Sequence, residues 1–408
     1  MSRLLLPLPM AALLSTSALA QSLPPPRIGD QPGFARVVLD LPKEATYQIE
    51  PLGAALRVTL PNQTVTPGLH FVSLPELAGY VLEQHEDQAV LILLTPQGVT
   101  PRSGYKTMTL AALQGEGQRL VIDLSGAFVD TSPLLSFPEF RFVKSGGRRF
   151  SVVVDAGHGG PDPGALGPVA EKVVNLEVAL RVRRFLQNAG VEVIMTRESD
   201  TAFSPDKRTD LAQRVALAEG KDLFVSIHAN AAVPARADGW CGLEVYYHSP
   251  ETTRPFFPSP APLLPTPPSL ALNPLEALEA AQPPSMQGGP LDPGAQPSLE
   301  DPGPIPPQSL PAPTPQMTSL RRMELSRTLA ARVLSYTLGA TAAVNRGVRS
   351  ADFFVIRYTS VPAILVEMGY LSHPIEGQNL RNPHYLDRIS YGIARGILEY
   401  LENDHPFK

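Results

Sequence analysis

Three apolar segments of this sequence end in residues that can bind a metal or move a proton. The segment SVVVDAGH ends in Asp155 and His158, LFVSIHAN ends in His228 and Asn230, and AILVEMGY contains Glu367 near its end. In open α/β sheets, sites form beyond the carboxyl ends of the parallel strands. Residues that are far apart in sequence are therefore expected to meet at one edge of the sheet.

Two histidines and one carboxylate around a metal, with a fourth position open to water, form a catalytic zinc arrangement. Glu171, in the first turn of an expected helix, could supply the carboxylate, and Glu177 and Asp155 compete with it. A second carboxylate outside the ligand set could transfer protons, and Glu367 fits that role by position. A single histidine at a strand end is more often structural, and an acidic residue can simply favour a helix N-terminus. The residues alone leave both interpretations open.

The segments around these residues alternate between strand and helix patterns. RFSVVVDA, VEVIMT, KDLFVSIHAN, GLEVYYH, DFFVIR and PAILVEMG read as strands. EKVVNLEVALRVRRFLQNAG, with Val178, Val182 and Phe185 at helical spacing, reads as a helix, as do DKRTDLAQRVALAE, RRMELSRTLAARVLSYTL and a last segment from Asn382-Pro383. Such alternation predicts an α/β domain over residues 148–408, with a mostly parallel sheet covered by helices on both faces.

The preceding part of the chain has a different pattern. Residues 27–128 contain short alternating segments, ARVVLDL, ALRVTL, AVLILLT and RLVIDL, separated by Pro, Gly and Asn. This pattern predicts a small all-β sandwich, joined to the second domain by a linker over residues 129–147. The sandwich shows no grouping of metal-ligating residues, so we expect a binding module.

The N-terminus and the composition indicate the compartment. MSRLLLPLPMAALLSTSALAQ has one arginine, an apolar stretch and ALA before Gln21, the pattern of a secretory signal peptide over residues 1–20. An uncleaved membrane anchor is the alternative, but the apolar stretch is short for a bilayer span of about 20 residues. The formal charge of −5, without a basic block, argues against nucleic acid as a partner. The single cysteine, Cys241, excludes an internal disulfide and is expected to be a small core residue.

A proline-rich segment interrupts the second domain. Twenty of the 66 residues from 251 to 316 are proline, so this segment cannot build a packed core. It contains LNPLEALEA, which could form a short helix. The histidines outside the apolar segments, His70, His85, His248, His373, His384 and His405, are predicted to lie at the surface. Arg214 could form a structural ion pair or belong to the site.

These motifs together resemble the zinc-dependent N-acetylmuramoyl-L-alanine amidases of the Amidase_3 family. The resemblance rests on VVVDAGHGGPDPGALG, EKVVNLEVA, MTRESDTAFSPDKRTDLAQRV, LFVSIHANA and NRGVRSADFFVIRYTSVPAILVEMGYLSH. It implies that His158, Glu171 and His228 bind Zn²⁺ and that Glu367 is the catalytic glutamate. It also implies cleavage of the amide between N-acetylmuramic acid and L-alanine of peptidoglycan. Residues 27–128 more weakly resemble the AMIN domain, a wall- or septum-targeting module that often precedes this catalytic domain.

The resemblance carries further expectations. It implies a periplasmic enzyme that acts in cell separation during division, without a stable membrane anchor after signal cleavage, and that is activated by a LytM-type protein. The insertion would then act as a lid, with Glu276 or Glu279 reaching the open zinc position, or as a passive surface loop. Other readings are a zinc carboxypeptidase or deacetylase acting on the same polymer, and a wall-binding scaffold with an inactive site.

Overall fold

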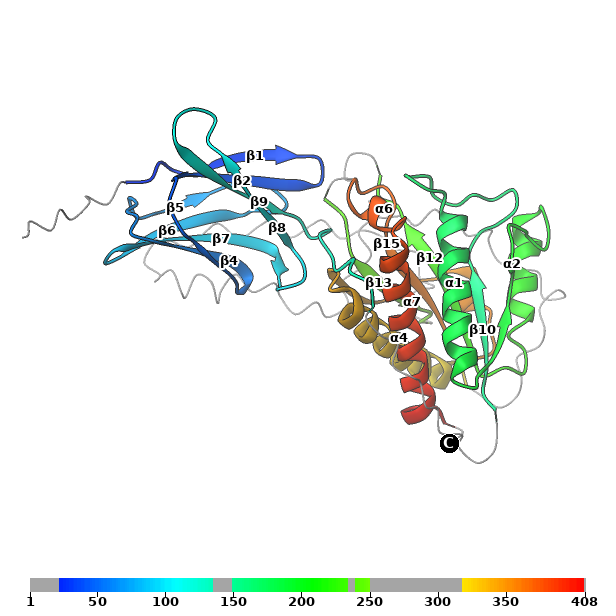
Figure 1. The fold of residues 1–408 in the computed structure, drawn as a ribbon. Coiled ribbons are helices and arrows are strands. Elements are labelled where there is room, and N and C mark those ends of the chain that lie inside the picture. The colour runs from blue at the N-terminus through cyan, green and yellow to red at the C-terminus, as the bar shows by residue number, and fades with distance from the viewer. Residues whose placement is uncertain (1–21, 135–148, 234–238, 250–317, 407–408) are drawn as a thin grey trace, which may run out of the picture.

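The computed structural model describes residues 22–134, 149–233, 239–249 and 318–406. Figure 1 shows these residues as an all-β body at the N-terminal end and a layered α/β body that follows it. None of the helices in the described parts combines the length and apolar character needed to cross a bilayer.

The N-terminal body is a sandwich of two antiparallel sheets. One has the order β1-β2-β9-β8, and the other has the order β3-β4-β7-β6-β5. In β2, alternate residues such as Val37 and Leu39 are buried, as expected for a sheet with one face on a core. Both sheets contribute to that core. The strands are β1 (Arg27–Gln31), β2 (Phe34–Pro42), β3 (Gln48–Pro51), β4 (Gly53–Pro61), β5 (Gly68–Phe71), β6 (Gly79–His85), β7 (Gln88–Val99), β8 (Tyr105–Ala111) and β9 (Gly117–Leu124).

The second body is built on a six-stranded mixed sheet in the order β11-β10-β12-β15-β13-β14. All neighbours are parallel except β13 and β15, which are antiparallel. Every residue of the central strands β10, β12 and β15 is buried, because both faces of these strands are covered. The strands are β10 (Ser151–Ala156), β11 (Glu192–Met195), β12 (Leu223–Asn230), β13 (Leu243–Tyr247), β14 (Asn345–Ser350) and β15 (Ala363–Tyr370).

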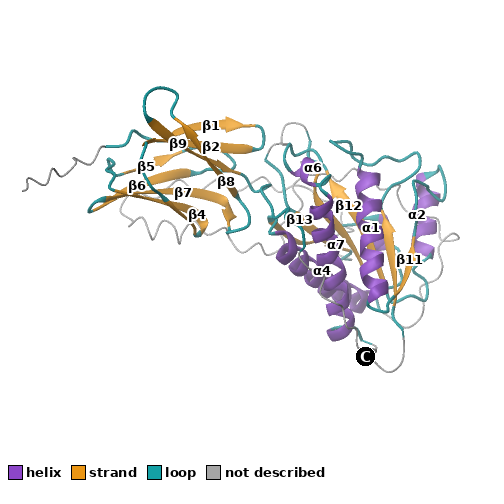
Figure 2. Ribbon diagram, in the orientation of Figure 1, coloured by secondary structure: helices purple, strands orange, loops and turns teal. Residues whose placement is uncertain are grey.

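Helices cover both faces of this sheet, as predicted (Figure 2). One apolar core joins the sheet to α1 (Glu171–Asn188), α4 (Ser319–Thr341) and α7 (Pro383–Asn403). A second core on the other face joins it to α2 (Lys207–Ala216) and α5 (Phe354–Arg357), and the short α6 (Glu376–Asn379) follows β15. Helix α7 begins at the expected cap, where the Asn382 side chain accepts a hydrogen bond from the backbone N–H of His384.

Some local predictions were wrong. The segment DFFVIR, predicted as a strand, contains helix α5, and the strand is the preceding polar segment Asn345–Ser350. His373 and His405 are buried rather than exposed. The His373 ring accepts backbone hydrogen bonds in the turn before α6, and the His405 ring packs against Phe150.

The segment after β9 contacts the α/β body directly. Asp130 donates its backbone N–H to Thr341, and its carboxylate lies 3.2 Å from Arg388 of α7. Asn379 donates to the carbonyl of Ala127 at 2.7 Å, and Val129 packs against the α/β core. The start of the predicted linker is therefore packed, whereas residues 135–148 lie outside the described residues.

Candidate metal centre

Three predicted ligands converge at the carboxyl edge of the sheet. His158 follows β10, Glu171 is the first residue of α1, and His228 lies near the end of β12. His158 Nε2 is 3.2 Å from Glu171 Oε2, and His228 Nδ1 is 2.9 Å from Glu171 Oε1. One ligand atom from each residue lies within 4.8 Å of the others, and all three residues are at most 5% exposed. This arrangement can hold one metal ion.

The imidazole of His158 is oriented by Asp162, which the sequence analysis did not single out. Asp162 Oδ2 lies 2.8 Å from His158 Nδ1, and Asp162 Oδ1 accepts the backbone N–H of Gly164. A carboxylate on one ring nitrogen directs the other ring nitrogen toward a metal. His158 Nε2 is buried and makes no well-formed hydrogen bond with any described residue. The sequence offered one signal for Asp162, which is that it lies four residues after the glycine-flanked His158.

The Glu171 carboxylate is fixed by the backbone on two sides. Oε2 accepts the N–H of Ala165 at 2.8 Å, and Oε1 accepts the N–H of Ala229 at 3.1 Å and the side-chain amide of Asn175 at 3.2 Å. Burial alone would raise the pKa of Glu171, but hydrogen bonds and charge from His158 and His228 hold it well below its usual value. Glu171 is therefore an ionised carboxylate with a fixed orientation, as binding a metal would require.

The two histidines differ in their ionisation. Burial lowers the pKa of His158, but the carboxylates of Asp162 and Glu171 outweigh that effect and raise it to about 9. Burial lowers the pKa of His228, and the contact with Glu171 only partly opposes the shift. His228 is therefore neutral at pH 7, and a neutral imidazole is the form that binds a metal. At His158, a metal would have to displace a proton.

Glu367 lies beside the ligands on the same sheet. It is in register with His228 on β12 and with Glu244 on β13, and it is 1% exposed. Burial, followed by the charges of Glu171 and Glu244, raises its pKa well above the usual value. Its Oε2 has no hydrogen-bond partner among the described residues. A raised pKa in such a position suits a group that takes up and releases a proton.

Glu244, which the sequence analysis also missed, is held by other groups. Its carboxylate accepts hydrogen bonds from Asn230 at 2.9 Å and from the Tyr370 hydroxyl at 2.7 Å, and it lies 2.9 Å from Arg349. The charge of Glu244 is thus compensated, and Asn230 faces this cluster.

The competing candidates do not join the ligand set. Asp155 accepts hydrogen bonds from Thr196, Ser226 and Arg214, so its oxygens are engaged below the site. Glu177 is exposed on α1 and pairs with Arg181. Cys241 is buried, as predicted, and burial and the charge of Glu376 raise its pKa well above the usual value.

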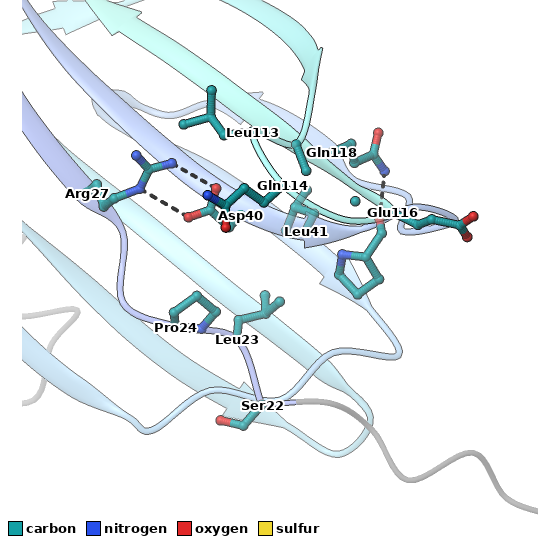
Figure 3. Close-up of a pocket in the computed structure, with 13 residues that line it drawn as sticks. Ser22, Leu23, Pro24, Arg27, Asp40, Leu41, Leu113, Gln114, Glu116 and Gln118 are labelled. Carbon is teal, nitrogen blue, oxygen red and sulfur yellow. Dashed lines mark hydrogen bonds and ion pairs between the residues drawn. The ribbon is translucent and has the colours of Figure 1, made fainter.

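A groove in the N-terminal sandwich contains none of the metal-centre residues. It has a volume of about 560 Å³. Figure 3 shows the ion pair of Arg27 and Asp40 on its wall, with Leu23, Leu41 and Leu113 nearby. The insertion over 251–316, including Glu276 and Glu279, and the expected signal peptide lie outside the described residues.

A sheet edge that brings two imidazoles and a carboxylate together, beside a further buried carboxylate, has the ligand types and the proton-transfer group of metal-dependent hydrolases. Comparison with known proteins specifies the family. Residues 152–399, more than half of the chain, match the model of the Amidase_3 family, N-acetylmuramoyl-L-alanine amidase. The chain belongs to this family and is an N-acetylmuramoyl-L-alanine amidase, in which His158, Glu171 and His228 form a group that could hold a metal ion.

Individual relatives carry the same description. The N-acetylmuramoyl-L-alanine amidase AmiA of Escherichia coli (strain K12) is 28% identical over 310 residues, which cover 76% of this chain and 92% of AmiA. The germination-specific N-acetylmuramoyl-L-alanine amidase of Bacillus subtilis (strain 168) is 28% identical over 261 residues, or 61% of this chain and 79% of that protein. The solved structure of AmiC2 of Nostoc punctiforme is 28% identical, covers 63% of this chain and 100% of its own, and has a TM-score of 0.41.

Proposed function

We propose that this protein is a zinc-dependent peptidoglycan amidase of the periplasm that acts in cell separation, with Glu367 as its catalytic residue. The observation that carries the chemistry is the convergence of His158, Glu171 and His228 beside Glu367. Ligand atoms that share one tetrahedral zinc ion lie roughly 3.3–3.6 Å apart, from bond lengths of about 2.0–2.2 Å. The nitrogens of His228 and His158 lie 2.9 and 3.2 Å from Glu171, each from a different carboxylate oxygen, and these two separations are close to that range.

The metal and Glu367 would have separate tasks in the proposed reaction. When bound, zinc would polarise the scissile carbonyl and lower the pKa of a bound water toward about 7. Glu367 would take a proton from the attacking water and deliver it to the amine of the leaving L-alanine. Its burial, which favours the protonated form, supports the second half of that transfer.

The products of peptidoglycan digestion test this proposal. Purified peptidoglycan is incubated with the full chain, and the soluble products are identified by mass spectrometry while bound zinc is measured on the same sample. An amidase releases intact stem peptides from the glycan, whereas a carboxypeptidase releases single amino acids and a deacetylase releases acetate. Absence of free stem peptides from a zinc-loaded sample would contradict the proposal.

The cellular setting is proposed from the N-terminal part of the chain. The signal-like segment over residues 1–20 supports export, and the two-sheet sandwich supports an AMIN-type targeting domain. A fluorescent fusion of residues 1–134 tests both, because a targeting domain would concentrate at the division site. Uniform fluorescence in the periplasm would argue against targeting, and retention in the cytoplasm would argue against export.

The proposed activator rests on the resemblance to division amidases. We expect a LytM-type protein to increase the release of stem peptides by the full chain and to have less effect on a chain that lacks residues 251–316. A passive loop instead predicts equal responses from both chains. Higher basal activity of the shortened chain would support a regulatory role for the insertion.

A further inference from the structure

Two buried arginines hold the backbone of the loop that carries His158. Arg197 donates from Nε to the carbonyl of Ala156 and from Nη2 to that of Gly157, both at 2.9 Å. Arg214 donates from Nη1 to the carbonyl of Ala156 and from Nη2 to that of His158, both at 2.8 Å. Three consecutive carbonyl groups, from residue 156 to residue 158, are therefore fixed by guanidinium groups.

Arg197 also connects this loop to the helix that carries the second ligand. The same Nη2 donates to the carbonyl of Lys172 at 2.7 Å, one residue after Glu171. The Lys172 ammonium in turn donates to the carbonyl of Gly160 at 2.8 Å. The loop after β10 and the first turn of α1 are thus tied together from both sides.

The backbone at His158 needs such support. Its φ angle is +61°, in the left-handed region, which costs a residue other than glycine roughly 1–2 kcal/mol. The carbonyl of His158 is bound by Arg214, and its ring is bound by Asp162 at 2.8 Å. Because both the backbone carbonyl and the ring of His158 are held, the conformation that turns Nε2 toward Glu171 is stabilised.

Two aspartates outside the metal-ligand group, Asp155 and Asp210, offset the formal charges of the two arginines. Arg214 pairs with Asp155 at 2.8 Å and with Asp210 at 2.7 Å. Two arginines and two aspartates carry no net formal charge, so they add no positive charge beside the site of a cation. A buried ion pair is weak evidence for stability, because apolar residues of similar size often serve as well. A guanidinium, however, can donate to several carbonyls at once.

We propose that Arg197 and Arg214 are positioning residues of the metal centre, which set the distance between His158 and Glu171. This inference rests on the proposed function for the identity of the metal. Among the described residues, neither arginine donates a hydrogen bond to the side chain of His158, Glu171 or His228, and both act through backbone carbonyls. A lysine at either position keeps the charge but has one nitrogen, so it cannot reproduce the forked contacts.

The test measures metal binding separately from activity. Arg197→Lys is the main variant, because Arg197 makes no ion pair among the described residues and its removal leaves no carboxylate unpaired. Arg214→Lys is the second variant, and Arg183→Lys is the matched control, since Arg183 pairs with Glu198 at the surface of α1. For each full-length protein, the affinity for Zn²⁺ is measured by competition with a chelating dye, and the Co²⁺ form is compared by visible spectroscopy.

We expect Arg197→Lys to weaken zinc affinity by about 10- to 100-fold, the range for loss of an outer-shell contact. The melting temperature of its metal-free form should stay close to that of the wild type, the Co²⁺ spectrum should change, and excess zinc should restore activity. Arg183→Lys should match the wild type throughout.

Folded Arg197→Lys and Arg214→Lys proteins with wild-type zinc affinity would overturn the inference and leave the proposed function intact. Failure of both variants to fold would also overturn it, since the arginines would then serve the fold itself. A wild-type chain that binds no zinc would remove the proposed function as well.

Discussion

The role proposed for Glu367 can be tested by a single change, Glu367→Gln. The side chain is 1% exposed, and its Oε2 has no hydrogen-bond partner among the described residues, so an amide of the same shape should fit. Glu367 is not part of the group His158, Glu171 and His228, so zinc should be retained. The change removes the ability to carry a proton and little else.

The expected loss of turnover follows from the task assigned to the carboxyl group. A positioned general acid–base residue contributes about 10²- to 10⁴-fold to the rate. At 1.36 kcal/mol for each factor of ten, this is about 2.7–5.4 kcal/mol of the activation free energy. The folded protein should also become more stable at neutral pH, because burial and the charges of Glu171 and Glu244 disfavour the ionised form of Glu367.

The assay compares kcat, zinc content and melting temperature across three variants. Glu367→Gln should lose kcat and keep zinc, whereas His228→Ala should lose both. Glu177→Gln, at an exposed glutamate on α1, should retain both. A Glu367→Gln protein that hydrolyses peptidoglycan within a factor of about ten of the wild-type rate would refute the reasoning, and the proton transfer would belong to another group.

Three further predictions concern the surroundings of the metal. Asp162→Asn should weaken zinc affinity by about 10- to 100-fold in a dye competition, because Asp162 orients the His158 ring; unchanged affinity would contradict this. Gly157→Ala should abolish zinc binding, because the added Cβ would lie 2.2 Å from His228 Nε2. The control Gly339→Ala should bind zinc normally, because its added Cβ would have no atom within 4 Å. Equal zinc content in the two variants would be inconsistent with this geometry. Metal-free protein should lose stability as the pH rises from about 6.5 to about 9, by at most on the order of 3 kcal/mol, because His158 has a folded-state pKa raised from 6.5 to about 9. Denaturant unfolding at several pH values measures this loss, and a flat profile over that interval would exclude it.

Much of the site was predictable from the sequence because its residues follow strong local patterns. Apolar segments that lead to His158, His228 and Glu367 mark buried strands, and the carboxyl ends of neighbouring parallel strands share one edge. The family resemblance then favoured Glu171 over Glu177. The structure gives the reason, since Glu171 is the first residue of α1 and faces the sheet edge, whereas Glu177 is exposed.

The segment DFFVIR shows where local pattern fails. A short apolar run fits a buried strand or a buried helix equally well. In the fold, Phe354, Val355 and Ile356 form a helical turn that packs on one face of the sheet. The edge strand β14 is formed by Asn345–Ser350, whose polar residues give little strand signal. Edge strands are only half covered, so their sequences need no apolar run.

The sequence by itself determined which residue types stand at the strand ends, because strand and helix periods are local properties of the chain, and the family resemblance then indicated the metal chemistry. Only the tertiary structure decided which distant groups surround them. Arg197 and Arg214 reach the His158 loop, and β13 runs antiparallel to β15, so that Glu244 faces Glu367. These contacts depend on register and on the packing of segments tens of residues apart, which no local pattern specifies.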